Sequence, residues 1–327
     1  MPNKTISVDR SPACLHGFGV ANGTFGELLQ GSLPEPEGNF LVTLPIAKCS
    51  KVWFTAGPSD RTLTVISNHK RKCHTLAQGL LRHFGAREVG VLRIESELPE
   101  GKGLASSSAD ATATARAICD ALGVPLDLEI LFQLLREIEP TDGVMYTGIV
   151  AFLHRKVRLL RRFGPLPQPL RIVAIDEGGE IDTLTYNRQS PGYTPSEQQT
   201  YRALLEQVGE AFSRGDLVAL GQIGTRSAML NQRRNPRRYL ADVLALREEV
   251  GALGVVVTHS GPCIGLLFES APHHDAAVEH AHAALRSLNP PVLSFRTSTN
   301  LRSAQQAPSF TVKHSNGAPM LKDPVVE

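Results

Sequence analysis

The chain has 327 residues, which exceeds one ordinary domain and is enough for two compact domains that share a cleft. Hydrophobic residues make up 42% of the chain and charged residues 20%, a balance that is typical of globular proteins and excludes disordered and collagen-like chains. A formal net charge of +2 provides no overall field that would attract nucleic acid or an anionic membrane, so we expect neither partner.

The cysteines and the first residues bear on the compartment. Five scattered cysteines, without a CxxC pair or the spacing of a zinc finger, predict reduced thiols. The first residues lack the basic start and apolar stretch of a secretory signal, and no apolar run approaches the roughly 18 residues that span a bilayer. We therefore expect a cytoplasmic protein.

In the first half of the chain, short runs rich in β-branched and aromatic residues predict strands at 40–46, 52–55, 63–66 and 91–97. We expect these strands to form one antiparallel sheet. Helices are predicted over 74–84 and 107–122. A third helix is predicted after Asp127, which can cap it, because apolar residues recur every three or four positions as far as Ile138, before Pro140.

A proline-rich stretch at 163–169 predicts the linker between an N-terminal domain, 1–165, and a C-terminal domain, 166–302. In the second half, helices are predicted at 196–213, 216–230, 238–253 and 274–288, and strands at 170–176, 255–259, 264–268 and 292–297. The fold class is therefore α+β. The polar, aperiodic residues 303–327 predict a disordered tail.

A glycine- and serine-rich loop joins the strand at 91–97 to the helix at 107–122. Gly101 and Gly103 let the backbone turn tightly and bring peptide N–H groups close to a ligand. The serines at 106–108 begin a helix whose free N–H groups and positive dipole attract phosphate, and serine hydroxyls there can ligate Mg²⁺. Alone, such a loop is more often a simple helix cap. The Walker pattern GxxxxGK[ST] is absent.

The longer pattern from Pro99 to Ala109, P-x-x-x-GLASSSA, resembles the second signature of the GHMP kinases. The stretch 21–31, ANGTFGELLQG, resembles the first signature of that family, and 258–265, THSGPCIG, resembles the third. The resemblance implies a ribosomal-protein-like N-terminal domain that holds ATP and a ferredoxin-like C-terminal domain that closes the substrate cleft. It assigns ATP binding to Pro99, Gly101, Lys102, Gly103, Leu104, Ala105, Ser106, Ser107, Ser108, Ser260 and Gly261.

The motifs GELLQG (26–31), GKGLASSSAD (101–110), IEPTDG (138–143) and HSG (259–261) resemble the L-threonine kinase branch of the family. The resemblance implies ATP-dependent phosphorylation of a small hydroxy amino acid, L-threonine above all. Homoserine, serine, an aminoalcohol and an isoprenoid precursor are alternative substrates. A different function, that of a catalytically weakened nucleotide sensor, also stays open. The sequence is compatible with a homodimer and leaves the oligomeric state open.

Phosphoryl transfer to an alcohol calls for a carboxylate that receives the hydroxyl proton. Asp142 is the candidate base because several GHMP kinases carry their catalytic aspartate at the matching place; alternatively, it caps a β-turn. For Mg²⁺ the candidates are Ser107 with either Glu137 or Glu139, which the spacing does not separate.

The first signature supplies the candidate substrate contacts, Thr24, Glu27 and Gln30. Thr24 stands where mevalonate-type kinases have a lysine that assists the base, so a lysine–aspartate pair is not expected. Glu27 and Gln30 are polar enough to recognise the ammonium or carboxylate of an amino acid, or else they bond within a tight turn.

Four histidines, His273, His274, His280 and His282, invite a metal-site interpretation. Neighbours on an α-helix point in different directions, and no HxxxH pair occurs among the four. We expect a solvated helix surface there.

Overall fold

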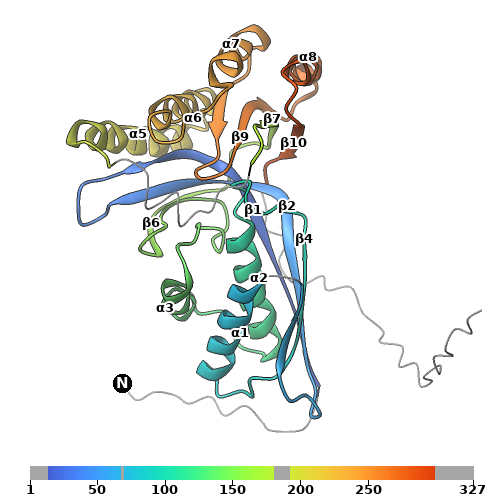
Figure 1. Cartoon of the computed structure of the whole chain (residues 1–327). Helices are drawn as coiled ribbons and strands as arrows, with labels where there is room; N and C mark the ends of the chain where they lie inside the picture. Colours follow the sequence, from blue (N-terminus) through green and yellow to red (C-terminus); the bar gives the residue numbers. More distant parts are fainter. Residues whose placement is uncertain (1–13, 68–69, 180–191, 299–327) are drawn as a thin grey trace, which may run out of the picture.

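The computed structural model describes residues 14–67, 70–179 and 192–298 (Figure 1). The fold is α+β, as predicted. The predicted tail, 303–327, lies outside the described residues. The strands are β1 (Leu15–Ser32), β2 (Asn39–Ala56), β3 (Leu63–Ile66), β4 (Gly90–Ser96), β5 (Ile149–Leu153), β6 (Arg158–Gly164), β7 (Leu170–Asp176), β8 (Gly254–Val257), β9 (Cys263–Glu269) and β10 (Val292–Arg296). The helices are α1 (Arg71–His83), α2 (Ser106–Ala121), α3 (Leu128–Ile138), α5 (Pro195–Arg214), α6 (Leu217–Asn231), α7 (Leu240–Val250) and α8 (Asp275–Ser287), with a 3-10 turn, η1 (Pro272–His274).

One sheet runs through both halves of the chain. Its strand order is β10-β7-β9-β8-β1-β2-β4-β3, and β5 pairs with β2 and β6. Strand β1 pairs along its length with β2 and meets β8 where Glu27 faces Val257. The predicted linker, 163–169, covers the end of β6 and the segment before β7, and the domain boundary assigned to it stays a prediction.

Three expectations about the sheet were wrong. The runs at 40–46 and 52–55 belong to one strand, β2. Polar residues between the two runs also pair with β1, for example Ser50 with Ala21, and this pairing keeps the segment extended. Strand β3 pairs parallel with β4, since α1 crosses between them and returns the chain in the same direction. Strands β1, β5 and β6 were not predicted; β6 has the arginine-rich sequence RLLRRFG, which lacks a strand-like pattern.

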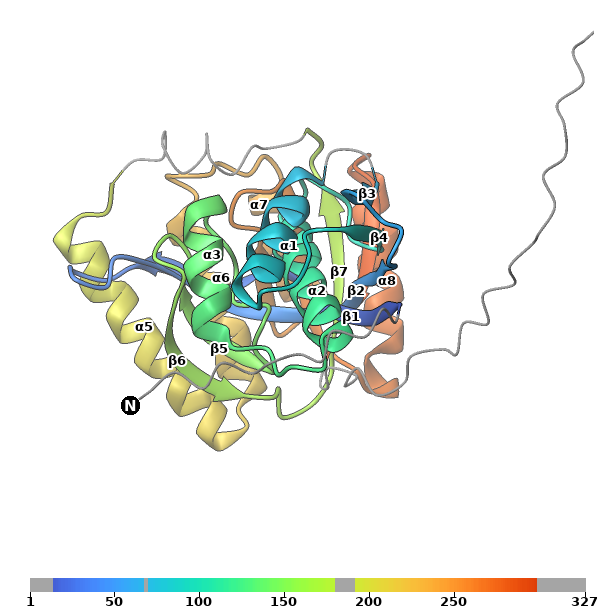
Figure 2. The ribbon, with the colours of Figure 1, turned by 90° about the horizontal axis from the view of Figure 1, so that it is seen from below.

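Helices α1 to α3 and helices α5 to α8 lie on opposite sides of the long β1–β2 pair (Figures 1 and 2). Helix α2 packs directly on β1 because two glycines remove the side chains between them. A Cβ atom at Gly17 would lie 2.0 Å from the Ala117 carbonyl oxygen, and one at Gly19 would lie 2.0 Å from that of Ala113. This close packing fixes where the first turn of α2 points.

The predicted helices are confirmed, with ends shifted by a few residues. Asp127 caps α3 as expected, and its side chain accepts a hydrogen bond from the Glu129 N–H at 2.8 Å. Helix α1 begins at Arg71 rather than at residue 74, which brings Lys72 and Cys73 into its first turn. None of the helices in the described part of the chain combines the length and apolar character that crossing a bilayer requires.

The contact between β1 and α2 yields a stability prediction. We expect Gly19→Ala to lower the free energy of unfolding by roughly 3 kcal/mol, since its Cβ meets backbone that cannot move without shifting α2. Gly192→Ala is the matched control, because nothing lies within 4 Å of a Cβ there, and it should change stability by less than about 0.5 kcal/mol. Urea unfolding measures both; equal midpoints would contradict the packing argument.

Candidate functional site

A pocket of about 310 Å³ lies where the first signature, the glycine-serine loop, the end of α3 and the turn between β8 and β9 meet. Its lining contains most of the residues singled out from the sequence, namely Glu27, Gly101, Gly103, Leu104, Ala105, Ser106, Ser107, Ser108, Glu139, Asp142 and Ser260. Thr24, Gln30, Pro99, Lys102, Glu137 and Gly261 do not line it.

The start of α2 forms one wall of the pocket. Ala105, the residue before the helix, has a left-handed φ of 56°, and no side chain caps the helix. A left-handed alanine is strained, and such residues concentrate at functional sites. Because Ala105, Ser106 and Ser107 line the pocket, the uncapped helix start faces a cavity of a size that admits phosphate groups.

The loop before α2 rests on the turn between β8 and β9. Gly103 has a left-handed φ of 71°, and a Cβ there would lie 2.6 Å from Thr258 Cβ. A Cβ at Gly261 would lie 2.1 Å from the Lys102 carbonyl oxygen. The Lys102 side chain bonds outside the pocket, 2.8 Å from Asp176 Oδ2 and 2.9 Å from the Gly179 carbonyl. Gly261 and Lys102 therefore join the two halves of the chain.

Glu139, and not Glu137, lies beside Ser107. The Ser107 hydroxyl donates to Glu139 Oε1 at 2.5 Å, and Lys72 Nζ pairs with Glu139 Oε2. Glu137 is exposed. Helix α3 ends at Ile138, and Glu139 is in extended backbone, so helical spacing no longer sets the direction of its side chain. The structure thus brings one of the two rival acids to the serine loop.

Asp142 is half-buried against the same helix start. Its backbone N–H donates to Ser108 Oγ at 3.0 Å, and the Ser108 hydroxyl donates to Asp142 Oδ2 at 3.3 Å. In the described part of the chain, this contact replaces the turn-capping bond that the alternative interpretation required. Burial raises the pKa of Asp142 to about 6; the bond from Ser108 opposes this shift, and the charge of Glu139 adds to it.

Glu27 places a buried carboxyl at this end of the pocket. Its side chain belongs to a residue that is 5% exposed, and Glu27 Oε2 has no hydrogen-bond partner among the described residues. Burial and then the charge of Asp142 raise its pKa well above the ordinary range, against weaker effects of the His259 backbone and Arg237. Thr141 Oγ1, which also lines the pocket, is likewise unpartnered within the described ranges.

Thr24 and Gln30, the other two candidates from the first signature, do not line the pocket but contact residues that do. The Thr24 N–H donates to the Leu104 carbonyl at 3.2 Å and so braces the loop. Gln30 Oε1 lies 2.8 Å from His259 Nδ1, while Gln30 Nε2 donates to the Val257 carbonyl at 3.4 Å. Burial lowers the pKa of His259 to about 3, so its ring is neutral. His154 lies beside it, with ring centroids 5.0 Å apart.

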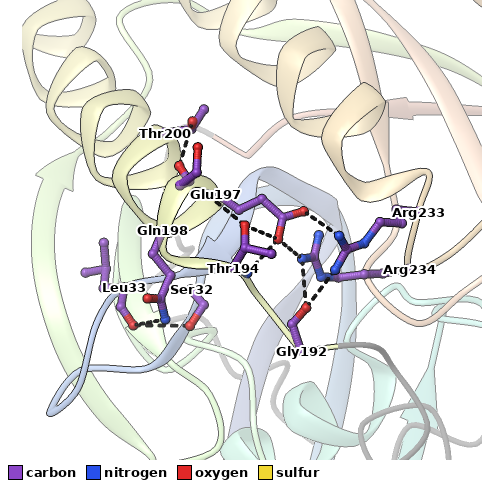
Figure 3. A network of polar contacts seen from close by, with 10 residues as sticks. Ser32, Leu33, Gly192, Thr194, Glu197, Gln198, Thr200, Arg233 and Arg234 are labelled. Atoms are coloured by element: carbon purple, nitrogen blue, oxygen red, sulfur yellow. Dashed lines mark hydrogen bonds and ion pairs between the residues drawn. The ribbon is translucent and has the colours of Figure 1, made fainter.

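A network of polar contacts surrounds Arg233 and Arg234 near the start of α5 (Figure 3). Arg234 donates to Glu197 Oε2 at 2.8 Å and to the Gly192 carbonyl at 3.3 Å, which ties the start of α5 to the loop after α6. The same loop reaches the turn through Asn235, whose side chain donates to the His259 carbonyl at 3.0 Å. The turn is therefore held on both faces.

Several pocket residues were missed in the sequence. Lys70 Nζ lies 2.6 Å from Asp110 Oδ2 and also pairs with Glu100, while the Ser50 hydroxyl donates to Asp110 Oδ1 at 2.5 Å. Burial opposes these contacts, but the hydrogen bonds to Asp110 and Glu100 raise the pKa of Lys70. Asp110 follows Ser106 by four residues, or one helical turn, so the sequence places both residues on the same face of α2. Lys70, Lys72 and His154 carry no such signal.

Two family profiles match the chain. The profile of the GHMP kinases N terminal domain matches residues 71–154, and that described as GHMP kinases C terminal matches residues 192–288. The chain is 30% identical to the L-threonine kinase of Salmonella typhimurium over 264 residues, which cover 78% of this chain and 83% of that protein. It is 31% identical to the L-threonine kinase of Citrobacter freundii over 255 residues, 76% of this chain and 85% of that one.

Among solved structures, a homoserine kinase from Cytophaga hutchinsonii superposes on the chain with a TM-score of 0.65 at 16% identity. The match covers 89% of this chain and 96% of the other. At this identity the likeness concerns the fold, and it extends over both halves.

Asp142 yields a prediction about pH. Between roughly pH 4 and pH 6 the native carboxyl keeps a proton that the unfolded one releases, so the free energy of unfolding falls as pH rises and stays lower above pH 6. This loss is on the order of 3 kcal/mol. We expect Asp142→Asn to be more stable than the parent at neutral pH and to flatten the pH dependence in this window.

Urea unfolding at a series of pH values measures this effect. The exposed Asp242 provides the control, because Asp242→Asn should keep the slope of the parent. If the Asp142→Asn slope also matched that of the parent, the assigned burial of Asp142 would be wrong.

Proposed function

Because the chain belongs to the GHMP kinase family and is a phosphotransferase that acts on a hydroxyl group, we propose that it transfers the γ-phosphoryl group of ATP to a small hydroxy amino acid, most specifically L-threonine. GHMP kinases use ATP. Two relatives at about 30% identity are L-threonine kinases, and a protein of the same fold is a homoserine kinase. All three names describe a hydroxy amino acid as the acceptor.

The observation that carries this proposal is the pair of carboxyls formed by the buried Glu27 and the half-buried Asp142. Glu27 Oε2 is unpartnered in the described residues, and the charge of Asp142 acts on Glu27. A buried carboxylate without a partner is costly, and an ammonium group from a ligand would offset that cost. An anionic acceptor such as an isoprenoid acid would add charge of the same sign. The pair therefore favours an acceptor that carries an amine.

The nucleotide end of the pocket carries cations beside acidic partners, since Lys70 pairs with Asp110 and Glu100 and Lys72 pairs with Glu139. Lys70, Lys72 and the uncapped start of α2 together favour the anionic phosphates of ATP. The Ser107 hydroxyl and the Glu139 carboxylate form an adjoining pair of hard oxygen donors, which is the ligand type that Mg²⁺ prefers. When bound, Mg²⁺ would supply charge neutralisation on the phosphates.

In the proposed reaction, the acceptor hydroxyl oxygen forms a bond to the γ-phosphorus, the bond to the bridging oxygen breaks, and ADP leaves. The hydroxyl proton passes to a carboxylate oxygen of Asp142. The pKa of Asp142, about 6, lies close to neutral pH, so this carboxylate can accept the hydroxyl proton and later release it to solvent. Thr24 braces the loop through its backbone, so a partner lysine is not supplied from that position.

An ADP-release assay with Mg-ATP tests the acceptor. The panel contains L-threonine, L-serine, homoserine, ethanolamine, 1-amino-2-propanol and mevalonate. We expect L-threonine to give the highest kcat/KM and mevalonate a value lower by at least about 100-fold, since a like charge replaces an opposite one. Turnover restricted to alcohols without an α-carboxylate would contradict the amino-acid assignment, and no turnover above the ATPase background with any acceptor would contradict the kinase proposal.

Two variants separate the roles of the carboxyl pair in the same assay. Glu27→Gln should raise the KM for L-threonine by roughly tenfold or more, through the loss of a charged contact with the amine. Asp142→Asn should lower kcat by about 100-fold while leaving the KM for ATP within a few-fold. A reversal of these two effects would exchange the assigned roles.

The metal assignment has a matched pair of variants. Glu139→Gln should raise the Mg²⁺ concentration for half-maximal activity by at least about tenfold, because it weakens one of the two proposed ligands. Glu137→Gln, an exposed change two residues away, should leave the requirement unchanged. The measurement is initial velocity against free Mg²⁺ at saturating ATP. A larger effect of Glu137→Gln would overturn the choice of Glu139.

A further inference from the structure

Two consecutive histidines lie together on the outer side of the second half of the chain. The sequence predicts that a helix begins near His274 and points neighbouring side chains apart. Instead, His273 and His274 lie in η1, a 3-10 turn before α8. Their ring centroids are 4.3 Å apart, with the ring planes tilted by 43°. The helical-spacing argument against a metal site therefore does not apply to this pair.

A carboxylate completes the group. Glu269, the last residue of β9, precedes the turn. One carboxylate oxygen of Glu269 and one ring nitrogen each of His273 and His274 all lie within 4.8 Å of one another. Small side-chain movements would bring three such atoms to the roughly 2.0–2.2 Å bond lengths of a shared metal ion.

Arg171 contacts the residues on both sides of the histidines. Arg171 Nη2 donates to the Ala271 carbonyl at 2.9 Å, and Arg171 Nη1 pairs with Asp275 Oδ1 at 2.6 Å. One side chain thus spans the turn just before and just after the pair. The ring of Phe268 meets that of His274 edge to face at 6.4 Å. These contacts limit the conformational freedom that metal binding would otherwise have to remove.

The donor set selects the class of metal. Two imidazoles and one carboxylate suit Zn²⁺ and neighbouring late transition ions, whereas Mg²⁺ prefers oxygen ligands alone. None of the three residues lines the pocket described above. We propose that Glu269, His273 and His274 bind one divalent transition-metal ion of the zinc class, which ties the end of β9 to the start of α8 and leaves a coordination position for water.

Isothermal titration calorimetry of the full chain, with any polyhistidine tag removed, tests the proposal with ZnCl2 as the probe. The expected result is one ion per chain with a dissociation constant in the micromolar range. MgCl2 should give no heat from this site. Bound Zn²⁺ should also raise the midpoint of urea unfolding, because the ligands come together only in the native state.

The variants assign the binding to these three residues. Glu269→Gln should weaken Zn²⁺ binding by at least about tenfold, and the double variant His273→Ala/His274→Ala should abolish it. His280→Ala, in α8 and outside the group, should bind as the parent does. Circular dichroism and L-threonine kinase activity check that each variant is folded. Millimolar or weaker binding by the parent, or unchanged binding by the double variant, would falsify the proposal.

Discussion

The site depends on a contact between two stretches of backbone. Neither Gly103 nor Gly261 has room for a Cβ, because the loop before α2 and the turn after β8 touch there without side chains between them. The Lys102–Asp176 ion pair reinforces the same contact from outside the pocket. The loop belongs to the first half of the chain and the turn to the second. Their close contact therefore places two glycine motifs that are distant in the sequence around one pocket.

The two ends of the pocket offer different contacts, which match two chemically different ligands. Lys70, Lys72 and the start of α2 lie toward the loop, where phosphates are proposed to bind. Glu27 and Asp142 lie toward β1 and the end of α3, where burial raises the pKa of each carboxyl. An ammonium group of the acceptor would offset the cost of the buried Glu27 carboxylate, and the free N–H groups at the start of α2 would donate to phosphate oxygens.

Packing contacts outside the pocket determine where the start of α2 and the turn between β8 and β9 lie. Gly17 and Gly19 let α2 lie on β1, which aims the helix start at the pocket. On the other side, Gln30 holds the neutral ring of His259, and Asn235 holds its carbonyl, so the turn has one orientation. The strand that carries Glu27 is therefore also the strand that orients the loop and the turn around it.

Features that lie within contiguous segments could be predicted from the residues alone. The α+β class, the helix capped by Asp127 and the phosphate-loop motif depend on local propensity and on residues that are neighbours in the chain. The motifs also identified the family that the comparisons then showed. Ser107, Asp142 and Glu27, which line the pocket, could be singled out in the sequence because each lies inside such a motif.

Which side chains meet could be learned only from the folded chain. The choice of Glu139 over Glu137 depends on where α3 stops, since one extended residue redirects the side chain. Lys70 and His154 reach the pocket from segments with no motif, and β3 pairs parallel with β4 because a helix crosses between them. The direction of a side chain and the pairing of distant segments follow from packing of the whole chain, which residue type and spacing do not specify.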